Sequence, residues 1–363
     1  MVSLLLTGCV PHTELNERAI IEAVGIDFDN GQYTVTMQYY NTLGSESDDI
    51  SETNVLTAKG TGSSVYNAIA DAGFSDGKTL MFGVNQLIII GENAAQKDIK
   101  ELLGFATTYY QSHSDVKIAV SEGTAENILS VKFKEGLIST KKLKFLFSNA
   151  EETGFSANRN IIEVMSAMSG STESVCLPLL KTSDTDSDVS EDGRTVEICG
   201  GVVYKNKVMA DKISLEAMSG VELLSNKGKE SVISLKYEGK EISVNAYGIR
   251  TEITPYIDDG QLVFSVKTRA NGEFLSADLN GNNAALAEEI GRLSSERLES
   301  RMKRAAEEAV LNHGTDVLML EAAVRNKSYG LWLEIKDRWE ETLKNSRFEF
   351  DTRVEIDRYG IEQ

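Results

Sequence analysis

Leu87-Ile88-Ile89-Ile90-Gly91 is a run of branched apolar residues that ends at a glycine. It has the length of a strand, and because it offers apolar side chains to both faces we expect a buried strand that is covered on both sides. The residues from Ala94 to Thr108 then show helical periodicity, and Val116 to Val120 has the composition of another strand. Since helices and strands alternate here, the N-terminal half is predicted to be a mixed α/β unit.

The segments before this strand follow the same mixed pattern. Asp29-Asn30-Gly31 lies between two apolar-rich runs within Val24 to Tyr40, which predicts a β-hairpin. We expect a helix from Glu14 to Ala23 before the hairpin. Another helix is predicted to begin after Ser64, a favourable N-cap residue, because apolar residues follow it at helical spacing.

The segment from Lys181 to Gly193 is polar and rich in aspartate. Such a composition is typical of a solvated loop or linker, so we place a domain boundary there. Asp258-Asp259-Gly260 further on has the composition of a hairpin turn, and turns this short favour antiparallel pairing. The strand patterns beyond the acidic segment are Glu197–Tyr204, Val208–Ala210, Val232–Tyr237, Glu241–Thr251 and Gln261–Ala270.

The C-terminal part combines long helical patterns with an alternating strand. An apolar stripe from Ala284 to about Asn312 predicts the longest helix, roughly 40 Å in length at 1.5 Å per residue. Strict alternation from Phe348 to Asp357 predicts a strand with one buried face. A second helix is predicted from four core residues on one face: Trp332, Ile335, Trp339 and Leu343. The predicted fold class is therefore α+β and multi-domain, with a C-terminal antiparallel sheet packed against a long helix.

Length and charge narrow the class of protein. The chain has 363 residues, which suits two or three domains, and 37 basic residues against 56 acidic ones give a net charge of −19. This balance argues against nucleic acid or a bare anionic lipid surface as a partner. With 41% hydrophobic and 26% charged residues, the composition is that of a globular protein. No apolar run reaches the roughly 18–20 residues that a membrane-spanning helix needs.

The cysteines and histidines are few. Because the only cysteines are Cys9, Cys176 and Cys199, we expect no disulfide framework, and the sequence leaves open whether the last two form a disulfide. None of the histidines has metal-ligand spacing to another histidine or cysteine, so we expect no transition-metal site. They are His12, His113 and His313.

Met1 to Cys9 combines a short apolar run with small residues before a cysteine. Leu6-Thr7-Gly8-Cys9 matches the end of a bacterial lipoprotein signal, which is cut before a lipid-modified thiol. No lysine or arginine precedes Cys9, so we expect further signal residues upstream. A lipid on Cys9 would hold the chain on a membrane face without a basic patch. The alternative is that these residues begin a buried strand and that Cys9 is a core thiol.

Three segments approach known ligand-binding loops without completing a motif. Gly73 to Thr79 has three residues between its glycines where a P-loop needs four, and Gly60 to Val65 lacks the third glycine of a dinucleotide site. The sequence contains no Gly-x-Ser-x-Gly and no His-Glu-x-x-His. A calcium loop is matched by Asp184, Asp186 and Asp188 but not by Val189 and Thr195. We therefore expect no enzyme activity, no catalytic residues, no metal and no cofactor.

Three blocks carry a family resemblance by their order and spacing. The first runs from Leu6 to Asp27 and includes Glu14-Leu15 and Gly25-Ile26-Asp27, and the second is Phe82 to Glu92. The third combines Gly200–Lys207, Asp316-Val317, Trp332, Ile335, Trp339 and the alternating strand that ends at Gly360. Together they resemble the C subunits of the nutrient germinant receptors of spore-forming Firmicutes, the Ger(x)C or GerAC-type lipoprotein family. The chain departs from the family pattern at Asn85, where histidine is common, and at Val10 and Pro11.

The resemblance implies a three-domain mixed α/β fold without catalytic residues. It also implies a lipid-anchored subunit, attached through Cys9, on the outer face of the spore inner membrane. Such a subunit would work with a multi-spanning A subunit and a transporter-like B subunit, so that nutrients trigger germination. The competing hypotheses are an extracytoplasmic solute-binding lipoprotein and an extracytoplasmic hydrolase, and direct binding of a small molecule is left open.

The expected domain limits follow from these patterns. Residues 1–8 are interpreted as the remnant of a lipoprotein signal, and 9–182 as an N-terminal germination-protein domain. Residues 183–195 are interpreted as an acidic linker. Residues 196–363 are expected to form a C-terminal GerAC-type domain, with a possible subdivision near 230–240.

Overall fold

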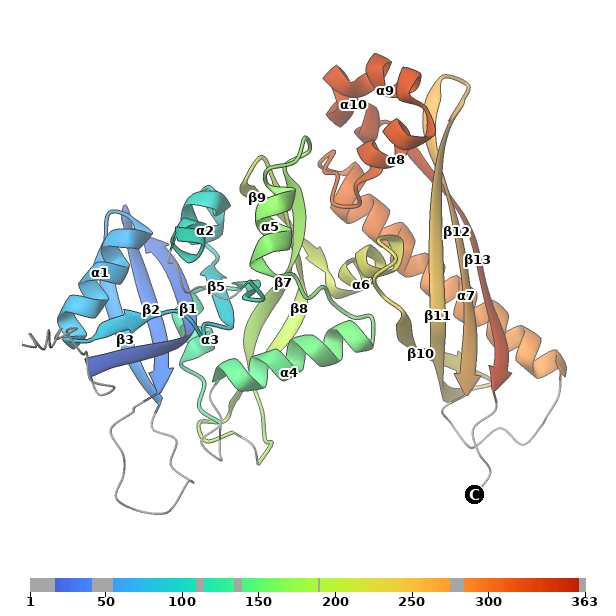
Figure 1. Cartoon of the computed structure of the whole chain (residues 1–363). Helices are drawn as coiled ribbons and strands as arrows, with labels where there is room; N and C mark the ends of the chain where they lie inside the picture. The colour runs from blue at the N-terminus through green and yellow to red at the C-terminus, as the bar shows by residue number, and fades with distance from the viewer. Residues whose placement is uncertain are drawn as a thin grey trace, which may run out of the picture.

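The computed structural model describes residues 17–40, 55–108, 114–133, 139–188, 190–274 and 284–358. Within these ranges the chain forms two β-sheets, one of nine strands and one of four. Helix α6 (Leu215–Leu224) lies between the two sheets, and α7 (Ala284–Ala305) crosses the four-stranded sheet and extends past β13 on its far side (Figure 1).

The nine-stranded sheet has the order β3-β2-β1-β5-β6-β7-β8-β9, and β4 also pairs with β1. Its centre, from β1 through β5 and β6 to β7, is parallel, and antiparallel hairpins extend it on both sides. The strands are β1 (Arg18–Asp29), β2 (Gln32–Tyr40), β3 (Val55–Gly62), β4 (Thr79–Met81), β5 (Leu87–Gly91), β6 (Lys117–Ser121), β7 (Ser174–Asp184), β8 (Arg194–Lys205) and β9 (Val208–Ser214).

Strand β5 is buried over its whole length, which confirms the expectation that it is covered on both sides. Ile88 and Ile90 belong to one hydrophobic cluster and Leu87 and Ile89 to another, as the period of two in a strand requires. The first cluster is covered by α1 (Val65–Asp76), α2 (Ile99–Thr108) and α5 (Ile161–Ala167). The second is covered by α3 (Ala125–Leu129) and α4 (Ser139–Glu152).

The hairpin at Asn30-Gly31 is confirmed, since β1 and β2 pair across it and both turn residues have positive φ. The helix expected from Glu14 to Ala23 is wrong in the part that the structure describes, because β1 already begins at Arg18. Pairing with β2 on one side and β4 and β5 on the other buries Ala19, Ile21 and Ala23, so tertiary contacts override the helical spacing of this segment.

The acidic segment connects two paired strands and does not separate two sheets. β7 and β8 pair antiparallel up to Asp184 and Arg194, and the Thr185 backbone N–H donates to the Gly193 carbonyl at 2.8 Å. The segment is therefore the end of a hairpin within one sheet, because a solvated composition suits a hairpin end as well as a linker, and the domain limits placed at it remain a prediction. The chain leaves the nine-stranded sheet after β9 and enters the second sheet at β10 (Glu230–Tyr237).

The second sheet has the order β10-β11-β12-β13 and is packed against α7, as expected for an α+β fold. β11 (Lys240–Asp258) and β12 (Gln261–Phe274) form the predicted hairpin, but β13 (Arg347–Arg358) runs parallel to β12. The sheet is thus not purely antiparallel, because the chain returns to it through a helical crossover. α7 continues into a π-helical turn, Ala306–Leu311, so the predicted long helix is confirmed.

The second C-terminal helix was expected to be continuous but consists of short pieces. They are α8 (Leu320–Lys327), α9 (Tyr329–Ile335), the 3₁₀ turn η5 (Lys336–Arg338) and α10 (Trp339–Lys344). Ile335 and Leu343 are buried as expected, while the backbone leaves α-helical geometry between α9 and α10. In Figure 1 these helices lie next to the tip of the β11–β12 hairpin.

Candidate functional site

The predicted lipid-attachment residue, Cys9, lies outside the described residues, as does His12. The lipid anchor therefore remains a prediction. Within the described part of the chain, no helix is long and apolar enough to cross a membrane. The candidate features that the structure does describe lie at the junction between the two sheets and beside β13.

A buried ion pair joins the two halves at the junction. Arg159 lies two residues before α5, and its carbonyl accepts the Ile118 N–H of β6 at 3.0 Å. Its guanidinium Nη2 donates to Glu222 Oε1 of α6 at 2.6 Å and its Nη1 to Oε2 at 3.4 Å. The two side chains are only 10% and 3% exposed. Burial disfavours the charge of Arg159, but Glu222 outweighs it, so the pKa of Arg159 lies above its ordinary value.

Further contacts surround this pair. Ser219 of α6 donates to the Gly154 carbonyl at 2.7 Å, and Lys227 pairs with Glu163 at 2.7 Å. On its other side, α6 approaches α7 closely: a Cβ on Gly220 would lie 2.1 Å from the Arg301 carbonyl oxygen, so only glycine fits this contact. α6 therefore contacts elements on both sides of the junction and joins the two sheets through these contacts.

A second set of buried carboxylates ties the cap helices α8 to α10 to the junction. Asp316 is 2% exposed and accepts the backbone N–H groups of Leu320 at 2.6 Å and Glu321 at 2.8 Å at the start of α8. Glu321 accepts from Trp332 Nε1 at 2.8 Å and from the Ser171 hydroxyl. Burial raises the pKa of Asp316 to about 6, against the opposing effect of the two N–H donors.

These groups line a cleft of about 610 Å³ at the junction. Its polar lining includes Arg159, Ser171, Ser174, Lys227, Asp316 and Glu321. Both carboxylates and the guanidinium are already hydrogen-bonded within the protein. The cleft thus combines the volume of a small-molecule site with polar groups that stabilise the junction.

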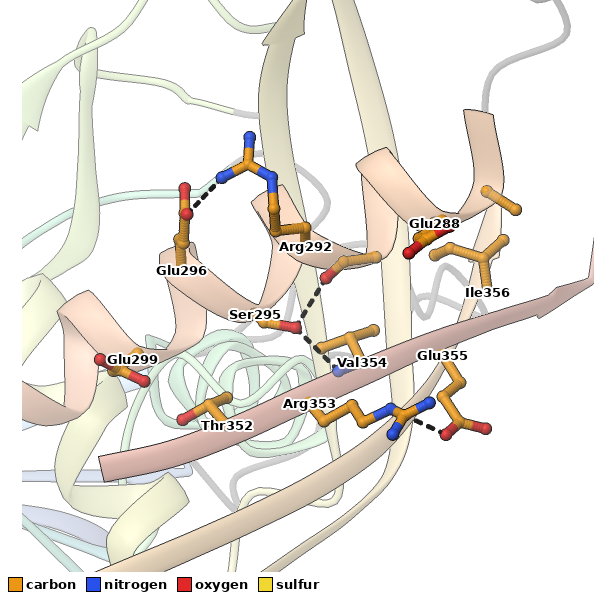
Figure 2. A pocket seen from close by; sticks show the side chains of 12 residues that line it. Glu288, Arg292, Ser295, Glu296, Glu299, Thr352, Arg353, Val354, Glu355 and Ile356 are labelled. Carbon is orange, nitrogen blue, oxygen red and sulfur yellow. Dashed lines mark hydrogen bonds and ion pairs between the residues drawn. The ribbon is translucent and has the colours of Figure 1, made fainter. Parts of the chain in front are cut away.

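A second groove, of about 640 Å³, runs between α7 and β13 and is drawn in Figure 2. Ser295 Oγ accepts the Val354 N–H of β13 at 2.8 Å and donates to the Gly291 carbonyl at 2.6 Å. The helix therefore occupies the open edge of the sheet at Val354, which blocks pairing with another strand there. The charged residues above it, such as Arg292 and Arg353, are more than half exposed and make ion pairs along their own element.

The Gly25-Ile26-Asp27 block proves to be structural. Asp27 is a partly buried carboxylate whose Oδ1 and Oδ2 accept the N–H groups of Ala125 at 2.7 Å and Glu126 at 3.1 Å, at the start of α3. A Cβ on Gly91 would lie 2.0 Å from Asp27 Oδ1, so the glycine after the buried strand makes room for this carboxylate. Burial raises the pKa of Asp27 despite these donors.

The remaining sequence candidates are not brought together. Cys176 and Cys199 are free thiols, and burial raises the pKa of Cys176 to about 12, which leaves it unreactive. Asp184, Asp186 and Asp188 lie at the β7–β8 hairpin end, and the described residues contain no group of three or more side chains placed to hold a metal. The glycines of the two loop-like segments lie in β3 and at the end of α1.

Sequence reasoning missed the junction residues. Arg159 and Glu222 are 63 positions apart, and neither lies in a pattern that marks it as buried. Asp316 belongs to the third block of the resemblance, but its role as the acceptor at the start of α8 is visible only in the fold. The signal that was present, an aspartate shortly before a helix, is typical of helix capping and does not by itself indicate a site.

Comparison with known proteins finds related families for most of the chain. Residues 11–182 match the family described as spore germination protein N-terminal domain, and residues 199–360 match the one described as spore germination B3/GerAC like, C-terminal. The spore germination protein YfkR of Bacillus subtilis (strain 168) is 21% identical over 280 residues, 75% of this chain and 72% of the relative. Spore germination protein B3 of the same organism is 23% identical over 127 residues, 34% of each chain.

A solved structure, that of the GerBC protein, has the same fold. It matches with a TM-score of 0.60 and 17% identity, and the match covers 92% of this chain and 96% of that one. The multi-domain α+β fold class is thus confirmed. Because the two matched domain families together span most of the sequence, the chain belongs to the GerAC-type family of germinant-receptor C subunits.

Proposed function

We propose that this chain is a non-enzymatic, lipid-anchored subunit of a spore nutrient germinant receptor. It is attached through Cys9 to the outer face of the spore inner membrane, where it acts with membrane subunits of the A and B type to trigger germination. The observation that carries the proposal is the order of the two germination-protein domains, 11–182 and 199–360, along one chain.

The bonded junction supports this role in physical terms. Arg159 and Glu222, together with the contacts of α6, join the two sheets, and such a junction would let a contact at one end be transmitted to the other. A lipid at Cys9 confines this body to the plane in which the membrane subunits sit. Confinement raises the effective concentration of the subunits for each other without requiring a strong interface.

The test compares spores of the native host that carry the wild-type gene, a deletion or Cys9→Ala. We expect the deletion to delay dipicolinate release after nutrient stimulation and Cys9→Ala to reproduce that delay, because the unanchored subunit is diluted away from its partners. Recovery of the A and B subunits with the chain from spore membranes should fall in the same variant.

Cys199→Ala is the matched control, since Cys199 is a free, half-buried thiol of β8. It should germinate and co-purify like the wild type. Normal germination and normal recovery with Cys9→Ala would contradict the anchoring. Normal germination of the deletion, in a host without a redundant paralogue, would contradict the receptor role itself.

A second candidate, an extracytoplasmic solute-binding lipoprotein, is favoured by the junction cleft alone, because its volume of about 610 Å³ lies in the range of small-molecule sites. Equilibrium dialysis of the chain against a panel of amino acids and sugars separates the two functions. Tight binding that is lost in Lys227→Ala, a substitution at the rim of the cleft, would favour the solute-binding function. The receptor-subunit proposal expects no tight binding in that panel.

A further inference from the structure

A cluster of cations and exposed apolar side chains lies on the helices α8 and α9 and the turn η5. We define it as the cap patch, made of Arg325, Lys327, Tyr329, Leu333, Lys336 and Arg338, all of them exposed. Tyr329 is 59% exposed and Leu333 is 45% exposed, although both are large and apolar. Because they are four residues apart on α9, they project from the same face of the helix.

Trp332 connects three members of the cap patch. Its ring lies 5.3 Å from that of Tyr329, and the Arg325 guanidinium and the Lys336 ammonium lie 5.8 and 5.5 Å from its centre. On the protein side, its Nε1 donates to the buried Glu321 at 2.8 Å, which fixes the ring on the body of the domain. Trp332 therefore joins Tyr329, Arg325 and Lys336 in one aromatic and cationic cluster.

The charge of the cap patch is opposite to that of the chain. The whole sequence carries −19, whereas residues 325–338 contain four cations against the two carboxylates of Glu334 and Asp337. None of the four cations forms an ion pair with any residue in the described part of the chain, although many other surface lysines and arginines do. These charges are thus available to an external anionic group.

We propose that the cap patch rests on an anionic phospholipid surface, with Tyr329 and Leu333 among the headgroups and the cations at the phosphates. Tyrosine and tryptophan next to lysine and arginine are the residues that prefer the membrane interface, because their apolar parts and polar tips match its two sides. Long basic side chains can bury their stems there while the charges reach the headgroups. This contact does not require a lipid on Cys9.

The net charge of −19 opposes binding of the chain as a whole to such a surface. The contact is therefore possible only if the electrostatic repulsion of the distant acidic residues is screened. At physiological ionic strength charges are screened beyond about 8 Å, and only the patch in contact then senses the lipid. The acidic remainder is held off, which orients the molecule with its cap helices towards the membrane. The expected binding is weak and is sensitive to single residues of the patch.

The test uses the full chain carrying Cys9→Ala, so that no lipid anchor contributes. We expect it to float with vesicles of phosphatidylglycerol and phosphatidylethanolamine at physiological salt, and not with vesicles of phosphatidylcholine alone. Lys336→Gln with Arg338→Gln should lower the partition coefficient by about fivefold per charge. Tyr329→Ser with Leu333→Ser should lower it by about tenfold or more, because their apolar surface no longer leaves water.

Two controls match these changes elsewhere on the surface. Phe74→Ser replaces an aromatic side chain of α1 that is 89% exposed, and Lys236→Gln with Lys240→Gln removes two exposed charges of the β10–β11 hairpin. Both should bind like the parent. A site-specific readout comes from Trp332, one of two tryptophans: in a Trp339→Phe background, brominated phosphatidylglycerol should quench its fluorescence.

Absence of flotation with the phosphatidylglycerol vesicles would overturn the proposal. So would equal losses in the patch variants and the controls, or flotation without quenching of Trp332. If the patch variants bound vesicles like the parent but impaired germination, the patch would contact a protein and the lipid proposal would be wrong. Because flotation is measured without spores, its failure is distinct from failure of the receptor-subunit role.

Discussion

Replacing Arg159 by methionine should lower the free energy of unfolding by about 3–5 kcal/mol, because it leaves the carboxylate of Glu222 buried without a partner. Glu222 is only 3% exposed at its side chain, so water does not reach it to compensate. The Nη2–Oε1 distance of 2.6 Å and the second contact at 3.4 Å show a two-point pairing, which a point charge at that position would not reproduce. Glu222→Met should lower the free energy of unfolding by a similar amount, because it leaves the guanidinium of Arg159 buried without a partner.

The double variant Arg159→Met with Glu222→Met distinguishes pairing from packing. Methionine is unbranched and similar in reach to both side chains, and replacement of a whole buried pair by apolar residues is often close to neutral. We therefore expect the double variant to recover most of the stability that either single variant loses. The resulting coupling free energy should be on the order of 3 kcal/mol or more.

The free energy of unfolding is measured by equilibrium unfolding in urea. Circular dichroism reports on the whole chain, and tryptophan fluorescence reports on the C-terminal half. The two probes should coincide in the wild type and separate in the single variants, because the pair joins the halves. Lys303→Met is the control, since Lys303 pairs with Glu299 on the exposed side of α7, and it should cost less than about 0.5 kcal/mol. If Arg159→Met cost no more than this control, or if the double variant cost the sum of the singles, the ion pair would not hold the junction.

Two further changes test the buried carboxylates. Burial raises the pKa of Asp316 to about 6, so the native state binds the proton of this carboxyl more tightly than the unfolded state does. The free energy of unfolding, relative to that of Asp316→Asn, should therefore fall by on the order of 3 kcal/mol as pH rises from about 4 to 6 and stay level above that. Parallel pH profiles of the urea midpoints of the two proteins would contradict this. Gly91→Ala should destabilise by about 2–4 kcal/mol, because the new Cβ displaces the Asp27 carboxylate from the start of α3. Gly330→Ala, which adds a Cβ in open space on α9, should instead raise the thermal midpoint slightly, and equal effects of the two glycine variants would refute the steric argument.

The elements that could be predicted from the sequence are those whose signal is local. The side chains from Leu87 to Ile90 point alternately into two hydrophobic clusters, and both clusters accept them because every position is apolar. Asn30-Gly31 forms a turn because both residues tolerate positive φ. The apolar stripe of α7 is long enough to establish a helix by itself. Each of these signals is complete within one continuous segment, so the rest of the chain does not alter it.

The sequence predictions differ from the structure where a strand pairs with segments that are distant in the sequence. Arg18 to Ala23 joins β1 because β2, β4 and β5 surround it, and the chain gives no sign of those neighbours within the segment itself. The acidic residues before Arg194 form the end of a hairpin, since β7 and β8 pair beyond them. β13 runs parallel to β12 because α7 to α10 intervene, and strand alternation is the same for either direction. Composition therefore described these segments correctly but did not determine their connections.

Several residues that carry the family resemblance have structural roles. Gly25-Ile26-Asp27 and Gly91 are among the residues that carry the resemblance, and in the structure they serve the start of α3 and the packing beside it. Asp316 and Trp332, from the third block, likewise hold α8 and α9 in place. A pattern of this kind identifies the fold that the members share and leaves their partners undefined. The residues that distinguish one subunit from another should thus be sought on exposed surfaces such as the cap patch, where Tyr329 and Leu333 face solvent and a change of side chain affects the core least.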